Sequence, residues 1–438
     1  MEVQFTEEIR QLQLGAGDTF HGEGILAITK ALLQSGVAYI GGYQGAPVSH
    51  LLDVMVQARP YLDTLGVHVE PCSNEASAAA MLGASIHYPL RGAVTWKSIV
   101  GTNVAADALS NLASPGVVGG ALIVVGEDYG EGASVIQERT HAYALKSTLL
   151  LLDPRPELAN MVRCVEHAFA LSEASNMPAV MELRIRACHV RGRFTARDNV
   201  APKLSTRDLI AEPAGFDYMR LAHPPVTFRH EKLKLEQRIP AAQAYIAQHG
   251  LNERFESGRH ADIGLVVQGG LYNALQRALQ QLGLADAFGA SEIPLLVLNV
   301  TYPLVPREVR DFCAGRQAVL VVEEGSPEYI EKDLLQALRL SGGEGKWLLK
   351  KTMEGHLPED ILYRPKMGFV TPISDWFRGP LAGEAEDLAN SSILAETGWF
   401  DTAFIAKAAR DHKVGLADNG RLLWQLVMLE KALSRLFG

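Results

Sequence analysis

The chain has 438 residues, of which 47% are hydrophobic and 21% are charged, so it can bury cores of ordinary size and lacks the composition of a disordered protein. Its net charge of −9, without a continuous stripe of basic residues, argues against binding to nucleic acid or anionic lipid. We therefore expect a small molecule or another protein as its binding partner.

The N-terminal residues and the cysteines indicate a cytoplasmic protein. Residues 1–15, MEVQFTEEIRQLQLG, are acidic and polar where a secretory signal is basic and then apolar, and no apolar run reaches the ~20 residues of a membrane helix. Cys72, Cys164, Cys188 and Cys313 lie far apart and form no CxxC pair. They encode no local zinc or iron–sulfur site, and we expect reduced core thiols.

Residues 1–190 are predicted to form an α/β domain. Short runs of β-branched and apolar residues alternate with Ala-rich or amphipathic helical stretches. Strands that are apolar throughout are typical of a parallel sheet covered on both faces. The predicted strands lie at 37–43, 66–71, 91–97, 120–128, 147–154 and 177–184.

The rest of the chain changes character twice. Residues 191–260 are rich in Arg, His and Pro, which predicts a connecting segment with one or two helices. Residues 261–340 contain three further strand–helix units, with strands predicted at 262–270, 294–300 and 317–325, and so predict a second, smaller doubly wound domain. Residues 341–438 follow as a mainly helical tail that carries four of the five tryptophans.

A glycine-rich turn follows the first predicted strand. In GGYQGAPVSHLLD (41–53), Gly45, Pro47 and Ser49 lie where a helix begins, so backbone N–H groups could approach a ligand at the carboxyl edge of the sheet. A tight strand-to-helix turn without a ligand would give the same pattern. The GxGxxG and GxxxxGK[ST] signatures of dinucleotide sites and P-loops are absent from the sequence.

Two further segments place polar residues at that edge. EPCSNEASAAAMLGAS (70–85) puts Asn74 and Glu75 just after a strand, on the first turn of a helix, where an acidic residue can also simply interact with free helix amides. TWKSIVGTNVAADAL (95–109) puts Lys97 at the end of the next strand and Asn103 at the start of the next helix. We expect both to face the edge that carries Glu75.

The order of these three segments resembles the pyrimidine-binding domain of indolepyruvate ferredoxin oxidoreductases, in which a GYPGTPSS-like turn, an NE-containing helix and an MKHVGLNVASD-like segment follow one another. NVTYPLVPREV (299–309) and VLVVEEGSPEYIE (319–331) extend the resemblance over residues 1–338. It implies two doubly wound, mainly parallel α/β domains, namely the pyrimidine-binding domain of a thiamine enzyme and a domain like the transketolase C-terminal one.

The resemblance implies that the chain is a subunit for oxidative decarboxylation of a 2-oxoacid, such as the aryl pyruvate indolepyruvate, on thiamine diphosphate with Mg²⁺. The acyl group would pass to coenzyme A and the electrons to ferredoxin. In thiamine enzymes a buried carboxylate hydrogen-bonds the aminopyrimidine ring, and Glu75 is the candidate for this role, while Lys97 could offset an anionic intermediate. The candidate cofactor-binding residues are Gly45, Pro47, Ser49, Asn74 and Asn103.

Departures from the family leave two questions open. Gln44, Ala46 and Val48 stand where the family commonly has Pro, Thr and Ser, and that Thr is expected to touch the substrate, so the exact 2-oxoacid is not defined. The GDG…N motif that holds magnesium and the diphosphate in a second thiamine domain is absent, as are the cluster-binding cysteines. We therefore expect a partner subunit that supplies both. A homodimer through the Ala-rich stretches of 74–113 is an alternative to their close packing on the sheet.

Residues 345–438 resemble a different family. RPKMGF (364–369) and LLWQLVMLE (422–430) are similar to the C-terminal end of asparagine synthetases and related glutamine-dependent amidotransferases, in which Lys366 matches a lysine that meets the phosphates of the adenylated intermediate. The ATP loop SGGxDS and the N-terminal cysteine nucleophile are absent. An ATP-dependent amidotransferase is thus the least favoured function, after a non-catalytic fusion or relic protein. We expect Lys366 to be a solvated loop lysine, and the tail to dock on the second α/β domain or be poorly ordered.

Overall fold

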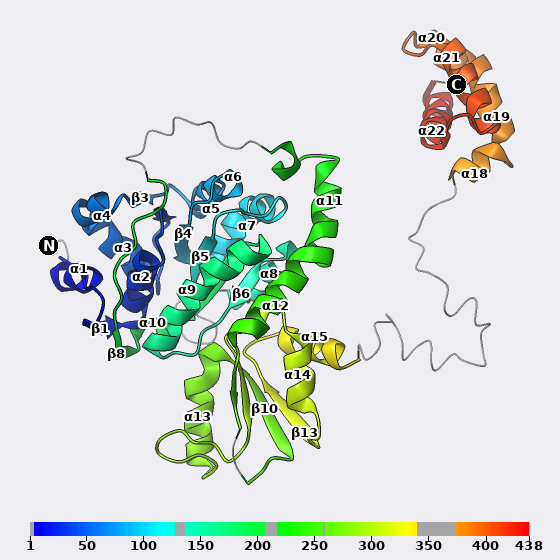
Figure 1. Cartoon of the computed structure of the whole chain (residues 1–438). Coiled ribbons are helices and arrows are strands. Elements are labelled where there is room, and N and C mark those ends of the chain that lie inside the picture. The colour runs from blue at the N-terminus through cyan, green and yellow to red at the C-terminus, as the bar shows by residue number, and fades with distance from the viewer. Residues whose placement is uncertain (1–3, 128–135, 206–216, 257–258, 340–372, 438) are drawn as a thin grey trace. The chain divides into compact units, whose positions relative to one another are not determined.

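The computed structural model describes residues 4–127, 136–205, 217–256, 259–339 and 373–437 (Figure 1). The chain divides into two compact units, residues 1–345 and 346–438, and each is described by itself. The expected boundary near residue 340 and the candidate Lys366 lie outside the described residues. No helix in the described ranges is long and apolar enough to cross a membrane.

The larger sheet of the first unit has seven strands in the order β12-β6-β7-β5-β4-β2-β3. Its strands are β2 (Tyr39–Gly42), β3 (His68–Pro71), β4 (Gly92–Lys97), β5 (Ala121–Glu127), β6 (Leu150–Leu152), β7 (Ala179–Arg184) and β12 (Val300–Tyr302). All pairs are parallel except β12 with β6. The six parallel strands lie within the six ranges predicted from the sequence, and the α/β fold class is confirmed.

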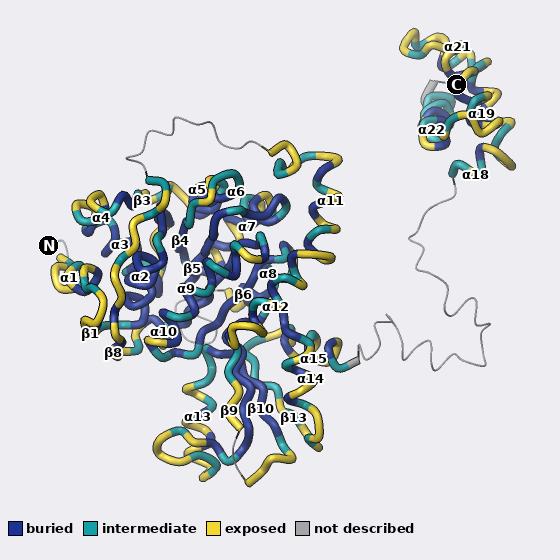
Figure 2. Tube along the Cα trace, viewed as in Figure 1, coloured by how far each residue is buried: buried dark blue, intermediate teal, exposed yellow. Residues whose placement is uncertain are grey.

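Helices cover both faces of this sheet, and β5 shows why its sequence is apolar throughout. Leu122 and Val124 of β5 belong to one buried cluster, while Ile123 and Val125 belong to another. Alternate residues of a strand point to opposite faces, so both faces of β5 pack against helices and no polar side exists. β5 and its neighbours are accordingly buried (Figure 2).

The first cluster includes residues of α2, α3 and α9, and the second includes residues of α5, α7 and α8. The helices of this region are α1 (Thr6–Leu12), α2 (Gly24–Gln34), α3 (Ser49–Gln57), α4 (Arg59–Leu65), α5 (Glu75–Met81), α6 (Ala84–His87), α7 (Val100–Ala113), α8 (His141–Ser147), α9 (Leu158–Ser175) and α10 (Ile185–His189). An antiparallel pair that the sequence did not indicate, β1 (Thr19–Glu23) with β8 (Arg191–Thr195), lies beside α2 and α9.

The smaller sheet has four strands in the order β13-β10-β11-β9. β10 (Ile263–Gln268) is parallel to β11 (Leu295–Leu298) and to β13 (Ala318–Val322), and β9 (Glu253–Phe255) is the antiparallel edge. The remaining elements are η1 (Tyr218–Arg220), α11 (Val226–Leu233), η2 (Lys234–Arg238), α12 (Ile239–His249), η3 (Gly269–Leu271), α13 (Tyr272–Gln281), α14 (Pro306–Cys313) and α15 (Tyr329–Arg339).

The strand predicted at 294–300 is divided between the two sheets. Its first part is β11 of the smaller sheet, whereas Val300 begins β12, which pairs with β6 of the larger sheet. Asn299 holds the crossing point, because its Nδ2 donates to Leu251 O at 2.8 Å and its Oδ1 accepts from Arg155 N at 2.8 Å. The two sheets therefore share one continuous stretch of chain.

The second unit is helical and has its own core. Its described elements are α18 (Ile373–Arg378), α19 (Ala382–Asp387), η4 (Leu388–Asn390), α20 (Ser392–Glu396), α21 (Thr402–Lys413) and α22 (Gly420–Phe437). Phe377, Leu394, Ile405 and Leu423 are among the residues of its buried cluster. Phe377 is thus buried, whereas Trp399 is exposed. The described part of the tail forms a packed unit rather than a poorly ordered one.

We predict that the two units can be destabilised separately. Leu394→Ala removes a fully buried side chain from the tail cluster and should lower the stability of that unit by roughly 2–5 kcal/mol. Four of the five tryptophans lie in residues 346–438, so the midpoint of urea unfolding followed by tryptophan fluorescence should fall. Leu122→Ala, an equally buried change in the first unit, should instead shift the transition followed by far-ultraviolet circular dichroism. Equal shifts of both signals in both variants would contradict this independence.

Candidate functional site

The larger sheet has a reversal of direction between β2 and β4. These strands are neighbours, yet the chain leaves β2 toward β3 on one side and leaves β4 toward β5 on the other. Loops that diverge in this way leave a crevice outside the carboxyl ends of the strands, where open α/β folds usually bind ligands. The segments with Gly45, Glu75 and Lys97 all follow strands next to this point.

The turn after β2 lies directly across the end of β4. A Cβ at Gly45 would lie 2.5 Å from the Cβ of Lys97 and 2.9 Å from its backbone nitrogen, so only glycine permits this approach. Pro47, which follows a cis peptide bond, is buried and packs on Gly126 of β5 in the same manner. Ser49 then begins α3 and is half-buried. The predicted strand-to-helix turn therefore crosses the sheet edge at the crevice.

Glu75 is the first residue of α5 and is 7% exposed. Asn74 is the N-cap of this helix, since its Oδ1 accepts from the Ser77 backbone nitrogen at 2.8 Å. A Cβ at Gly101 would lie 2.9 Å from Oε1 of Glu75, which shows that the carboxylate packs against the first turn of α7. Within the described ranges this buried carboxylate has neither a hydrogen bond nor an ion pair.

A buried carboxylate without a protein partner is costly and therefore uncommon. Burial fits a group whose hydrogen-bond partner belongs to a ligand. The side-chain oxygen of Asn74 is engaged by the helix that it caps, and the cofactor-binding role of this residue stays a prediction.

Lys97 and Asn103 are not brought to the same place. Lys97 is half-buried at the end of β4, beside Gly45. Asn103 is exposed and accepts a hydrogen bond from the Tyr143 hydroxyl. It lies two residues beyond Gly101 on α7, about 200° around the helix axis, so it faces away from Glu75.

Asn103 lines a separate cavity of about 380 Å³ between α7, α8 and the SPEY segment. The exposed Lys146 and the buried Arg139 also line this cavity. Arg139 is engaged by protein groups, because its Nη1 donates to Glu323 Oε1 at 3.0 Å and to Pro327 O at 3.1 Å. The cavity therefore lies between helices that pack on the larger sheet and the segment that follows the last strand of the smaller sheet.

A buried cluster of charges, which the sequence did not indicate, occupies the other half of the same sheet edge. Arg184 at the end of β7 donates from Nη1 to Asp153 Oδ1 at 2.7 Å and from Nε to Glu324 Oε2 at 2.6 Å. Burial disfavours the charged guanidinium, but the carboxylates of Asp153 and Glu182 raise the pKa of Arg184 well above its ordinary value. Glu324 follows β13, so this ion pair joins the two sheets.

The cluster also contains a pair of acidic residues. Burial, the nearby charge of Glu127 and the charge of Asp153 raise the pKa of Glu182 well above its ordinary value, and the two glutamates are hydrogen-bonded. Glu127 also accepts from the Thr140 backbone nitrogen at 3.3 Å. The direction of this shift favours the protonated form of Glu182, which then donates its carboxyl proton to Glu127.

The EEGSPEYIE run has a structural role in this region. Glu323 accepts from the backbone nitrogens of Tyr329 at 2.8 Å and Glu331 at 3.0 Å, so it caps α15. The Tyr329 ring stacks on His141, with centroids 5.0 Å apart. Burial and the charge of Arg139 lower the pKa of His141 to about 3, so this histidine is neutral near pH 7. The run thus attaches the smaller sheet to α8.

Two family models match parts of the chain. Residues 252–339 match the family model of the indolepyruvate ferredoxin oxidoreductase middle domain, and residues 334–434 match that of asparagine synthase. The chain is 29% identical over 323 residues to indolepyruvate oxidoreductase subunit IorA of Methanothermobacter thermautotrophicus, covering 73% of this chain and 48% of that one. The predicted resemblance is confirmed. The chain spans about half the length of the IorA relatives that it matches.

Two other comparisons concern the fold and the tail. A 2-oxoglutarate:ferredoxin oxidoreductase from Magnetococcus marinus, solved with 2-oxoglutarate, coenzyme A and succinyl-CoA, matches with a TM-score of 0.55 at 14% identity, over 74% of this chain and 61% of that one. This likeness concerns the fold alone. Asparagine synthetase 1 of Bacillus subtilis is 29% identical over 91 residues, which is 21% of this chain and 14% of that enzyme. The predicted similarity of the tail is also confirmed.

We predict that Glu182→Gln stabilises the first unit. The pKa of Glu182 is higher in the folded state than its ordinary value of 4.5, so the folded state keeps this proton at pH values where the unfolded chain has released it. The stability contributed by the protonated group is therefore lost as the pH rises. A neutral amide keeps an N–H donor toward Glu127 without titrating. The unfolding free energy should therefore rise by on the order of 1 kcal/mol at about pH 8, and by less at about pH 5.

The measurement is urea unfolding followed by circular dichroism at the two pH values. Glu236→Gln is the matched control, because Glu236 is exposed and pairs only with Lys232 at 3.7 Å. A Glu182→Gln variant whose gain does not grow with pH would contradict protonation of Glu182.

Proposed function

We propose that this chain is a subunit of a thiamine-diphosphate-dependent 2-oxoacid:ferredoxin oxidoreductase and contributes the pyrimidine side of its active site. The observation that carries the proposal is the buried carboxylate of Glu75 near the reversal between β2 and β4, which has no hydrogen bond or ion pair with the residues that the structure describes. The similarity of the chain to IorA supports the reaction class. An aryl pyruvate such as indolepyruvate is the proposed substrate.

The described residues fit the aminopyrimidine end of thiamine diphosphate. Glu75 offers a carboxylate in a site that excludes most water, which strengthens a hydrogen bond to a ring nitrogen. Gly101 leaves the space that the carboxylate occupies, and Gly45 brings the turn after β2 against Lys97. The cofactor, when bound, supplies the carbon nucleophile and the electron sink for decarboxylation.

The roles of the protein groups follow from their positions. Glu75 holds the aminopyrimidine and accepts or returns a proton at the ring nitrogen. Lys97, half-buried beside the turn, contributes a positive charge that offsets negative charge developing on the substrate. Pro47, which packs on Gly126, and Ser49, which begins α3, are proposed to hold the turn in this position. Asn103 is proposed to act at the cavity that it shares with Lys146, on the far side of α7 from Glu75.

Binding of the diphosphate and Mg²⁺ is assigned to a partner subunit. The GDG…N motif is absent from the sequence, and the described residues contain no group of three or more His, Cys, Asp or Glu side chains suited to a metal ion. The same partner, or another, would carry the iron–sulfur clusters and pass electrons to ferredoxin. A cytoplasmic location and a homodimer stay predictions.

The tail is not proposed to add a synthetase activity. It matches only the end of asparagine synthetase, and the sequence lacks the SGGxDS loop that would bind ATP. We expect no exchange of pyrophosphate into ATP in the presence of aspartate, and such exchange would support a synthetase activity.

The first prediction of the proposal concerns the isolated chain. Thiamine and thiamine diphosphate should bind with similar, weak affinity, because the chain holds only the pyrimidine end. Saturation-transfer NMR with each compound measures this binding. Glu75→Gln should weaken the affinity for both compounds about tenfold or more. Glu70→Gln, a change at an exposed residue of β3, should leave both affinities unchanged. If the isolated chain bound thiamine diphosphate tightly and thiamine only weakly, this result would contradict the need for a partner.

The second prediction concerns the assembled enzyme. Glu75→Gln should lower 2-oxoacid-dependent reduction of ferredoxin by roughly 100-fold or more, since a positioned acid–base group usually contributes that much. Gly101→Ala should also lower the rate, because its Cβ would lie 2.9 Å from Oε1 of Glu75. Unchanged rates in Glu75→Gln would remove the residue from the mechanism.

A further inference from the structure

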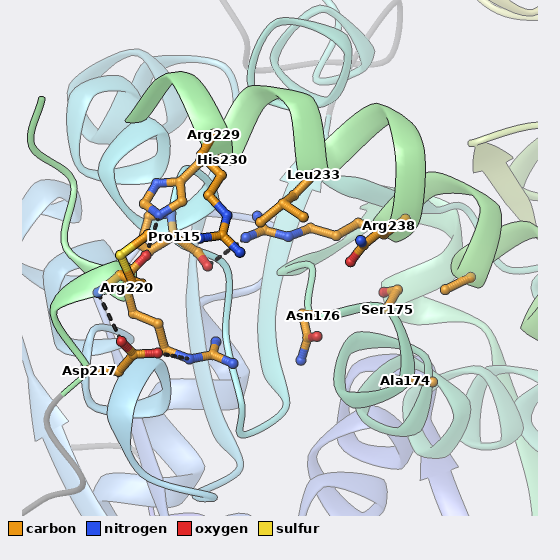
Figure 3. Close-up of a pocket in the computed structure, with 13 residues that line it drawn as sticks. Pro115, Ala174, Ser175, Asn176, Asp217, Arg220, Arg229, His230, Leu233 and Arg238 are labelled. Carbon is orange, nitrogen blue, oxygen red and sulfur yellow. Dashed lines mark hydrogen bonds and ion pairs between the residues drawn. The ribbon is translucent and has the colours of Figure 1, made fainter. Parts of the chain in front are cut away.

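A cavity of about 380 Å³ is lined, among the described residues, by none of those proposed to bind or act on thiamine diphosphate (Figure 3). Its lining comes from the helical run α11–η2–α12, from η1 with the preceding Asp217, and from the turns that follow α7 and α9. Pro115 and Asn176 represent those turns. The cavity is within the size range of small-molecule sites, and nothing in the proposed oxidoreductase chemistry uses it.

Three arginines line this cavity. Figure 3 shows Arg229 and Arg238 coming from the helical run across the top of the view and Arg220 from the segment at the lower left. The only acidic residue among the described lining residues is Asp217, whose Oδ2 lies 3.8 Å from Nε of Arg220. The lining therefore carries an excess of two positive charges at neutral pH.

Arg238 forms a fixed wall of the cavity. Its Nη1 donates to Ser114 O at 3.0 Å and its Nη2 donates to Pro115 O at 2.7 Å, at the end of α7. A Cβ at Gly116 would lie 2.9 Å from the guanidinium, so a glycine is needed for this fit. Burial and the charge of Arg220 lower the pKa of Arg238 to about 10.

His230 fixes the neighbouring wall. One ring nitrogen, Nε2, is 2.6 Å from Met219 O, and the other, Nδ1, is 3.1 Å from Ser114 Oγ. The ring therefore donates to the carbonyl through Nε2 and accepts from the serine hydroxyl through Nδ1. These bonds hold η1, with Arg220, against α11, with Arg229. The arginines are thus presented by an ordered frame.

The exposed Arg229 differs from the other two arginines. In the part of the chain that the structure describes, it forms no hydrogen bond or ion pair, whereas Arg220 has Asp217 and Arg238 has the carbonyls of α7. A guanidinium presents several N–H donors in a planar fork that matches the oxygens of a phosphate group. Two such forks facing one cavity favour a doubly charged oxyanion over a single carboxylate.

We propose that the cavity between α11, η1 and the ends of α7 and α9 binds a small phosphate-bearing ligand, with Arg220 and Arg229 donating to the phosphate. Arg238 adds positive charge from the wall. The volume exceeds the needs of the phosphate group, so a phosphate monoester with a compact organic part fits better than the free ion. This site is independent of the proposed thiamine chemistry.

The test is calorimetric titration of the full chain at low ionic strength with glycerol 3-phosphate, inorganic phosphate and glycerol. Both phosphates should bind saturably and glycerol should not. Arg229→Gln should weaken phosphate binding roughly tenfold or more, and Arg220→Gln should do the same. Arg277→Gln, an exposed arginine on α13 outside the cavity, is the matched control and should bind as the unmodified chain does. Raised salt should weaken binding.

The three titrations distinguish a phosphate monoester from free phosphate as the ligand. Tighter binding of glycerol 3-phosphate supports a monoester ligand, and equal binding of both supports recognition of the phosphate group itself. Absence of phosphate binding, or equal affinities in Arg229→Gln, Arg220→Gln and Arg277→Gln, would overturn the proposal. Glu75→Gln should leave phosphate binding unchanged, so failure at this site and failure of the thiamine proposal are distinguishable.

Discussion

The arrangement of the first unit depends on Arg184. This guanidinium is buried at the end of β7, and it bonds to Asp153 after β6 and to Glu324 after β13. Gln268 at the end of β10 adds a bond from Nε2 to Asp153 Oδ2 at 3.1 Å and accepts from Glu324 N at 2.8 Å. Removing any one partner would leave a buried charge unpaired, which typically costs 3–5 kcal/mol, so the geometry of the two sheets is closely defined.

The cluster also divides the carboxyl edge of the larger sheet into two parts. On the side of β6, β7 and β5 the charged groups are satisfied by one another. On the side of β4, β2 and β3 the turn with Gly45 packs on Lys97, and the buried carboxylate of Glu75 has no hydrogen bond or ion pair with the described residues. These mutually paired charges hold the sheets together, whereas Glu75, which has no partner among the described residues, is the group proposed to act on the cofactor.

Much of the fold could be predicted, because the strands of the larger sheet are apolar on both faces and the sequence shows this directly. The site edge could be predicted for the same reason, since the carboxyl ends of parallel strands meet at one edge. Asn103 was harder to place, because a shift of two residues on a helix turns a side chain to another face. The charge cluster gave no local signal: Glu182 and Arg184 occur in an ordinary strand, MELR, and their partners lie far along the chain. The change of sheet at Asn299 likewise depends on contacts with Leu251 and Arg155.

The short strand β12 has a consequence for motion within the first unit. Many two-domain enzymes open and close by rotation about a hinge, which requires a linker whose ends can separate. Here the chain passes directly from β11 of the smaller sheet through Asn299 to β12 at the edge of the larger sheet. Because Val300 already pairs with Leu152, no flexible linker separates the two sheets at this point. The two sheets should therefore move as one rigid block. Access to the proposed site beside Glu75 would then not depend on rotation of one sheet against the other.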